Sequence, residues 1–266
     1  MKTLSKVYTA LIFFFLYAPI AVLILFSFND SKSRVTWHGF TLKWYEELFQ
    51  NDQLMDALIV TLSVAALTAV FATIIGTVSA VGIHSLGKRM KNVFMTVNNI
   101  PMVNPEIVTA VSLLLIFVFV SEATGLFEMG FLTLLLSHIT FSIPYVILQV
   151  SPKLRQMNAH MYEAALDLGC SPMKAFFKVV LPEIMPGILT GALMAFTLSL
   201  DDFVISLFTS GSSAQPLSVV IYSMTRHRVS PEVNALSTLL FVTVFVLLLI
   251  VNIAQMRDDA KKKTTR

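Results

Sequence analysis

The feature that most restricts how this chain can fold is a series of apolar stretches, each long enough to cross a lipid bilayer as a helix. A spanning helix needs about 20 mostly apolar residues. None of the stretches contains a Lys or an Arg. The sequence therefore predicts an all-α integral membrane protein with six transmembrane helices. They cover residues 8–28, 57–84, 93–120, 131–150, 184–208 and 235–255.

The composition agrees with a membrane protein and excludes several other classes. Hydrophobic residues make up 56% of the chain and charged residues only 13%, whereas soluble domains are about 25% charged. The net charge is +3 and the basic residues are dispersed, which argues against a nucleic-acid partner. The single cysteine, Cys170, excludes an internal disulfide and a cysteine-based metal cluster.

The basic residues predict the orientation of the chain in the membrane. Loops on the cytoplasmic side of a membrane carry an excess of Lys and Arg. With the N-terminus inside, only five of the 19 Lys and Arg residues lie outside, so both termini are expected to be cytoplasmic. These five are Lys32, Arg34, Lys43, Arg226 and Arg228.

A polar segment at about 151–183, between the fourth and fifth stretches, has helix signals of its own. Asn158 is placed to cap a helix that ends near Leu168, and Gly169 stands where a left-handed residue is wanted. Ser171-Pro172 then predicts the start of a second short helix, which Leu181-Pro182 is expected to stop. Either a helix that docks in a groove of another protein or a loop resting on the membrane surface fits this spacing.

This segment carries a resemblance. "EAALDLG" followed by "VVLPEIMPG" resembles the EAA signature of ABC-importer permeases, with matches at Glu163, Ala164, Ala165, Gly169, Leu181 and Pro182. The resemblance implies the type I ABC-importer permease fold. It also implies that the segment is a coupling loop, in which Glu163 anchors the loop and Gly169 supplies the sharp turn.

Other segments resemble the PotC-type permeases of spermidine/putrescine importers. They are "WHGFTLKWYEELF", "LSHITFSIPYVI", "LSLDDFVISLFTSG" and "YSMTRHRVSPEVNALST". The resemblance implies a permease subunit in a bacterial cytoplasmic membrane that moves polyamines by alternating access. Its implied partners are two copies of a cytoplasmic ATPase subunit, a second homologous permease, an external polyamine-binding protein and the lipid bilayer.

We expect three parts along the chain. The first helix and an external segment occupy residues 1–56. The permease domain occupies residues 57–255, and a basic cytoplasmic tail occupies residues 256–266.

Three carboxylates lie within the apolar stretches and are candidates for a substrate pathway. Ionisable groups inside a membrane are functional candidates by default. Glu106 and the adjacent Asp201 and Asp202 fall at similar expected depths, and no Lys or Arg in these stretches could neutralise them. On a continuous helix the two aspartates would point about 100° apart. A cationic substrate, a basic residue of a second subunit, water, or a hydrogen bond within the chain could each accommodate them.

Further residues in and beside the stretches lead to predictions about binding and packing. Trp44 and Tyr45 could stack on alkylammonium groups or form an aromatic belt at the membrane surface. His138 is expected to be a hydrogen-bonded core histidine. The stripe Gly187, Gly191, Ala195 and Ser199 predicts close helix packing. Pro101 and Pro105 predict a helix break.

The chain is expected to bind no cofactor and to catalyse no reaction itself. "GIHSLGKR" at residues 82–89 nearly matches a P-loop, but Arg89 replaces the hydroxyl residue and the stretch ends an apolar helix. ATP and magnesium would then bind to the partner ATPase. The alternatives left open are a permease of the same type for another solute, a proton-driven secondary transporter, and a membrane enzyme.

Overall fold

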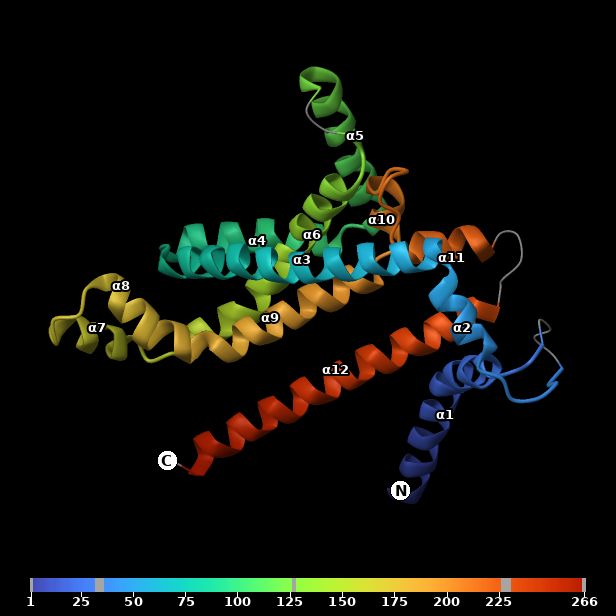
Figure 1. Ribbon diagram of the computed structural model, residues 1–266. Helices are drawn as coiled ribbons and strands as arrows, with labels where there is room; N and C mark the ends of the chain where they lie inside the picture. The colour runs from blue at the N-terminus through green and yellow to red at the C-terminus, as the bar shows by residue number, and fades with distance from the viewer. Residues whose placement is uncertain (1, 32–35, 126–127, 226–230, 265–266) are drawn as a thin grey trace. The chain divides into compact units, whose positions relative to one another are not determined.

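The computed structural model of this chain describes residues 2–31, 36–125, 128–225 and 231–264. Within these ranges the regular structure is helical, apart from an isolated β-bridge between Asn29 and Phe40 (Figure 1). The helices are α1 (Lys2–Ser27), α2 (Lys43–Gln50), α3 (Asp52–Ser85), α4 (Lys88–Val103), α5 (Glu106–Thr124), α6 (Phe131–Gln156), α7 (Ala159–Asp167), α8 (Pro172–Ala175), the π-helical turn η1 (Phe176–Val180), α9 (Leu181–Asp201), α10 (Val204–Thr209), α11 (Leu217–Thr225) and α12 (Pro231–Thr264).

Five helical stretches in the described part of the chain are long and apolar enough to cross a membrane. The expected sixth span, 235–255, falls in α12, whose searched apolar part is the shorter segment Pro231–Val246. The six-span count therefore stays a prediction. The five stretches are Lys6–Ser27, Asp52–Ser85, Glu106–Thr124, Phe131–Gln156 and Pro172–Asp201.

The predicted orientation also stays a prediction, because the fold does not show which side of a membrane each helix end faces. Of the five basic residues assigned to the external side, Lys32, Arg34, Arg226 and Arg228 fall in undescribed segments. So do Arg266 of the basic tail and part of "YSMTRHRVSPEVNALST".

The chain forms two compact units, one made of residues 1–56 with 221–266 and the other of residues 57–220. In the first unit α12 packs against α1 and α2. The Asn51 amide of this unit donates a hydrogen bond of 2.9 Å to the Glu232 carboxylate. The second unit contains α4 to α10 and most of α3, and its core is built on α6.

Helix α6 packs along α9 through the predicted stripe of small residues, which is confirmed. Gly187, Gly191 and Ser199 are buried on α9. A Cβ added at Gly187 would lie 2.9 Å from the Gln149 carbonyl oxygen, closer than real Cβ atoms come to a neighbour. On α3, a Cβ at Gly76 would lie 2.7 Å from the Val146 Cβ. Small residues therefore bring both neighbouring helices against the backbone of α6.

The prediction that Leu181-Pro182 ends the second short helix of the segment 151–183 is wrong. The chain stays helical from Pro172 to Asp201, because the π-helical turn η1 comes directly before the proline. The Leu181 N–H bonds to the Phe176 carbonyl, five residues earlier. Proline has no N–H and its ring crowds the carbonyl four residues before it. The wider turn accommodates Pro182 without ending the helix.

Two of the long predicted spans are divided. Residues 93–120 form parts of α4 and α5, which meet at the extended Asn104, so the break predicted from Pro101 and Pro105 is confirmed. Residues 184–208 do not form one helix, because Asp202 has an extended backbone with ψ of 131°. The expectation of two aspartates on one continuous helix is therefore wrong.

Candidate functional site

An acidic pocket of about 250 Å³ lies where the end of α9 meets α5, α6 and α10. It brings together all three carboxylates singled out in the sequence. Helix α10 packs against both α5 and α6, and α6 packs along α9 (Figure 1). None of the described residues that line the pocket is basic. They are Glu106, Phe141, Thr197, Leu198, Asp201, Asp202, Phe203 and Val204.

The break between α4 and α5 places Glu106 in this pocket. Pro105 is the N-cap residue of α5 and Glu106 is its first residue. The N–H groups at a helix start carry a partial positive charge that favours a carboxylate. Glu106 is exposed, so its charge is available to a ligand.

The two adjacent aspartates differ in their surroundings. Asp201 is the last residue of α9 and is exposed. Only 4% of the Asp202 side chain is exposed, and its carboxylate accepts a 2.7 Å hydrogen bond from the Ser206 N–H. The Asp202 carboxylate is thus engaged with the backbone N–H groups at the start of α10. Asp201 and Glu106 are the two exposed carboxylates that line the pocket.

His138 is a hydrogen-bonded core histidine, as predicted. It is 3% exposed. Its Nδ1 lies 2.6 Å from the Ser199 Oγ and its Nε2 lies 3.1 Å from the Ser206 Oγ. These partners are 61 and 68 residues further along the chain, and no local spacing in the sequence indicates that they meet.

Trp44 and Tyr45 lie in the first compact unit and are engaged within it. Trp44 is 3% exposed, and its Nε1–H donates a 2.7 Å hydrogen bond to the Asn29 carbonyl. The Tyr45 hydroxyl is 2.8 Å from the Ser27 Oγ, and its ring packs on Phe28. The Lys43 ammonium lies 5.5 Å from the centroid of the Trp44 ring. A role of Trp44 and Tyr45 in contacting substrate stays a prediction.

The segment 151–183 has the local structure that its sequence predicts up to η1. The Asn158 side chain accepts a hydrogen bond from the His160 N–H at the start of α7. Gly169 has a φ of +84°, as its place after the helix requires. The Glu163 carboxylate is exposed and lies 3.2 Å from the His160 Nδ1.

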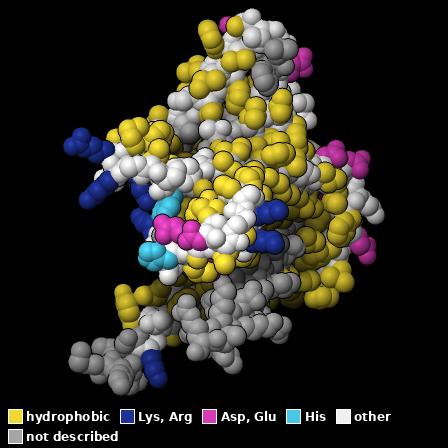
Figure 2. Space-filling model, turned by 90° about the vertical axis from the view of Figure 1, so that its left-hand side faces the viewer, with side chains coloured by type: hydrophobic (Ala, Val, Ile, Leu, Met, Phe, Trp, Pro, Cys, Tyr) yellow, Lys and Arg dark blue, Asp and Glu magenta, His cyan; other side chains and the backbone are white. Residues whose placement is uncertain are grey.

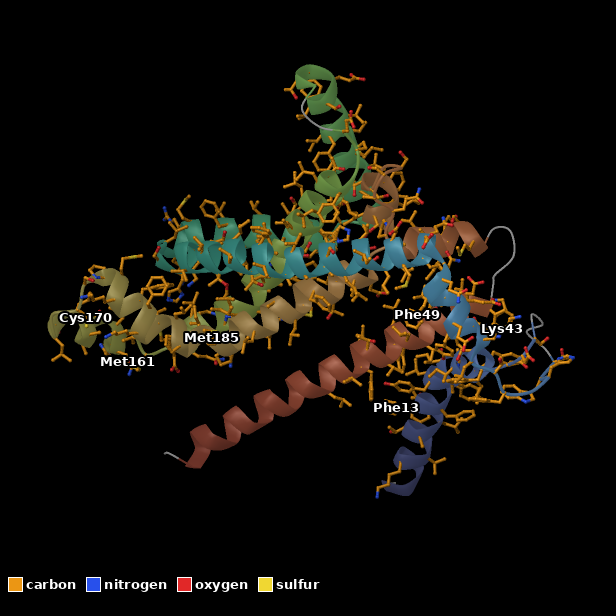
Figure 3. The ribbon with its side chains drawn as sticks, viewed as in Figure 1. Phe13, Lys43, Phe49, Met161, Cys170 and Met185 are labelled. Atoms are coloured by element: carbon orange, nitrogen blue, oxygen red, sulfur yellow. The ribbon has the colours of Figure 1, made fainter. Side chains whose placement is uncertain are left out.

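Both apolar and charged side chains are exposed on the surface of this segment. Leu168 is 86% exposed and Met173 is 67% exposed. Ala164 is exposed and Ala165 half-buried. Figure 3 labels Met161 and Cys170 on α7 and before α8. The face in Figure 2 that includes this end of the second unit shows hydrophobic side chains beside acidic, basic and histidine groups. Such a surface suits contact with another protein.

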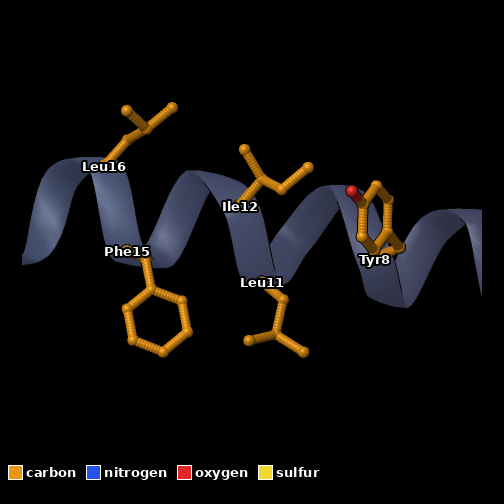
Figure 4. Close-up of a pocket in the computed structure, with 5 residues that line it drawn as sticks. All are labelled: Tyr8, Leu11, Ile12, Phe15 and Leu16. Carbon is orange, nitrogen blue, oxygen red and sulfur yellow. The ribbon is translucent and has the colours of Figure 1, made fainter.

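A second hollow lies on α1, and apart from the Tyr8 hydroxyl its lining side chains are apolar. It is lined by Tyr8, Leu11, Ile12, Phe15 and Leu16, all from one helix (Figure 4). A helix that faces lipid or another subunit exposes apolar side chains along its length, as α1 does. We assign no ligand to it.

The fold and the acidic pocket are those of a membrane-embedded transport subunit. Residues 72–262 match the family described as binding-protein-dependent transport system inner membrane component. The chain belongs to this family, and the prediction of a permease subunit is confirmed.

Individual relatives agree with the family. The chain is 44% identical over 230 residues to the putrescine transport system permease protein PotI of Escherichia coli (strain K12), covering 86% of this chain and 82% of that protein. It is 41% identical over 253 residues to the spermidine/putrescine transport system permease protein PotC of the same strain, covering 95% and 94%. The resemblance to spermidine/putrescine permeases is confirmed.

A solved structure has the same fold. A bacterial ABC transporter involved in the import of the acidic polysaccharide alginate matches with a TM-score of 0.77 and 18% identity, covering 96% of this chain and 95% of that chain. At this identity the likeness shows the fold alone. It confirms the predicted fold class of an ABC-importer permease.

Proposed function

We propose that this chain is the membrane-spanning permease subunit of an ATP-driven importer of polyamines such as putrescine and spermidine. The observation that carries the proposal is the acidic pocket, in which Glu106 and Asp201 both expose a carboxylate and no described lining residue is basic. The names of the relatives at 44% and 41% identity supply the substrate class.

The pocket chemistry fits an alkylammonium cation. Each ammonium group of a polyamine is a strong hydrogen-bond donor that pairs best with a carboxylate. The Phe141 ring lines the same pocket and lies 5.4 Å from the Tyr145 ring, centroid to centroid. Aromatic faces attract cations within about 6 Å of the ring centroid, and their apolar surface suits the methylene chain between the ammonium groups.

The transport cycle would use partners on both sides of the membrane. An external binding protein delivers the polyamine, and a second permease completes the pathway. Two cytoplasmic ATPase subunits hydrolyse ATP, and the exposed segment around α7 and α8 receives their movement. This chain would then alternate its access between the two sides without changing the substrate chemically.

The test is uptake of labelled putrescine and spermidine by cells that carry this chain with its partner subunits. Asp201→Asn and Glu106→Gln should each lower uptake by about tenfold or more, because each removes one charge-assisted hydrogen bond to an ammonium group. Glu122→Gln is the matched control, since Glu122 is an exposed carboxylate near the other end of α5. Wild-type uptake by both pocket variants, with normal amounts of assembled transporter, would overturn the proposed pathway.

A further inference from the structure

The break between α9 and α10 is held by specific hydrogen bonds. Helix α9 ends at Asp201, Asp202 is extended, and α10 begins at Val204. The first N–H groups of a helix have no partner within it. The Asp202 carboxylate accepts from the Ser206 N–H at 2.7 Å and from the Ile205 N–H at 3.4 Å. Asp202, which lies between α9 and α10, therefore caps the start of α10.

One imidazole on α6 joins the two sides of this break. The His138 Nδ1 bonds to Ser199 on α9, and its Nε2 bonds to Ser206 on α10. A neutral imidazole has one donor and one acceptor, and each serine hydroxyl takes either role. Both ring nitrogens are thus satisfied. The Nε2 also lies 3.5 Å from the Asp202 carboxylate.

The whole arrangement is buried, so its hydrogen bonds are costly to break. His138 is 3% exposed, Ser199 5% and Ser206 0%. A buried polar group that loses its partner bears the full desolvation cost, and linked buried hydrogen bonds act together. The Asp202 carbonyl is fixed as well, because it accepts a 2.9 Å hydrogen bond from the Ser218 Oγ.

We propose that His138 is a positioning residue for the substrate pathway. By bonding to the last turn of α9 and to α10, it fixes the angle at which α9 ends and so sets where the Asp201 carboxylate stands in the pocket. His138 itself is buried and touches no substrate. This inference rests on the proposed function, because it acts through the pathway role of Asp201.

A double-mutant cycle in the complete transporter tests the proposal. His138→Phe and Asp201→Asn should each lower polyamine uptake per assembled complex by about tenfold. The double variant should transport no worse than Asp201→Asn alone, because the residue that His138 positions has already lost its charge. His138→Gln should recover part of the uptake, since its amide reaches toward the position of Nε2 and keeps a bond to Ser206.

Ser142→Ala is the matched control for a change inside α6. Ser142 lies one turn beyond His138 and is 0% exposed, and its hydroxyl has no hydrogen-bond partner among the described residues. Its replacement should leave uptake unchanged. If His138→Phe prevents assembly, Ser206→Ala replaces it in the double-mutant cycle. Ser206→Ala should then lower uptake in the same way, and it should not lower uptake further when combined with Asp201→Asn.

The outcomes separate this inference from the proposed function. If Asp201→Asn lowers uptake and the two losses multiply in the double variant, the positioning role of His138 is overturned while the acidic pathway stands. If Asp201→Asn transports like wild type, the pathway role of Asp201 and the inference fall together.

Discussion

Asp201 and Asp202 are neighbours of the same type with different surroundings, and the difference follows from one backbone torsion. Because the chain leaves the helix at Asp202, that side chain turns to the start of α10 and Asp201 stays exposed in the pocket. The sequence around them, "LSLDDFVISLF", contains no Gly or Pro that signals a break. Sequence reasoning could place the acids at one depth and point them apart, but it could not foresee that Asp202 caps α10.

A conservative pair of variants distinguishes a capping role of Asp202 from a charge role. Asparagine caps a helix about as well as aspartate, whereas alanine at a cap costs about 0.5–2 kcal/mol. Asp202→Asn should therefore keep uptake close to wild type, and Asp202→Ala should lower the thermal stability of the solubilised complex. If Asp202→Asn loses uptake as severely as Asp201→Asn, the charge of Asp202 is required and the capping account is wrong.

At the scale of elements, local signals predicted both ends of α7 but not the course of the chain at Pro182. Asn158 and Gly169 act through their own neighbours, so their roles could be inferred from spacing alone. The turn at Pro182 could not, because whether a proline ends a helix or is absorbed by a π-helical turn depends on packing beyond it. Here Val180 and Ile184 are buried in one core with α6, and this packing favours a continuous helix.

The left-handed turn between α7 and α8 gives a prediction that a second glycine, Gly87, can control. Gly169 has a φ of +84°, and a Cβ there would meet no atom of the described residues within 4 Å. Gly169→Ala should thus act only through the backbone, at a cost of about 1–2 kcal/mol. We expect reduced uptake for each ATP hydrolysed, measured on the assembled transporter.

Gly87→Ala is the control for that change. In the described part of the chain Gly87 also has no neighbour within 4 Å of an added Cβ, but its φ is −60°. It should behave as wild type. Equal coupling losses in both variants would show that the left-handed turn is not what matters.

At the scale of the whole molecule, the single cysteine reports the orientation of the chain. Cys170 lies between α7 and α8 and is half-buried. If this segment is cytoplasmic, a membrane-impermeant maleimide should label Cys170 in inside-out vesicles and not in intact spheroplasts. Ser212→Cys combined with Cys170→Ser should give the opposite result, because Ser212 is exposed in the segment after α10. Labelling of Cys170 from outside would invert the predicted topology.

The family and the spanning helices could be inferred from the sequence because long apolar stretches and the EAA signature are local features. The acidic pocket could be inferred only in part, since its geometry depends on helices that are distant in sequence. The burial of Trp44 could not be foreseen, because the Asn29 carbonyl that accepts its hydrogen bond lies 15 residues earlier in the chain.

The most direct test of the account is labelled putrescine and spermidine uptake with and without a working ATPase partner. Cells with the complete transporter should accumulate a polyamine, and an ATPase variant that cannot hydrolyse ATP should abolish accumulation while the complex still assembles. Accumulation that persists without ATP hydrolysis, or transport of an anion in place of either polyamine, would contradict the account.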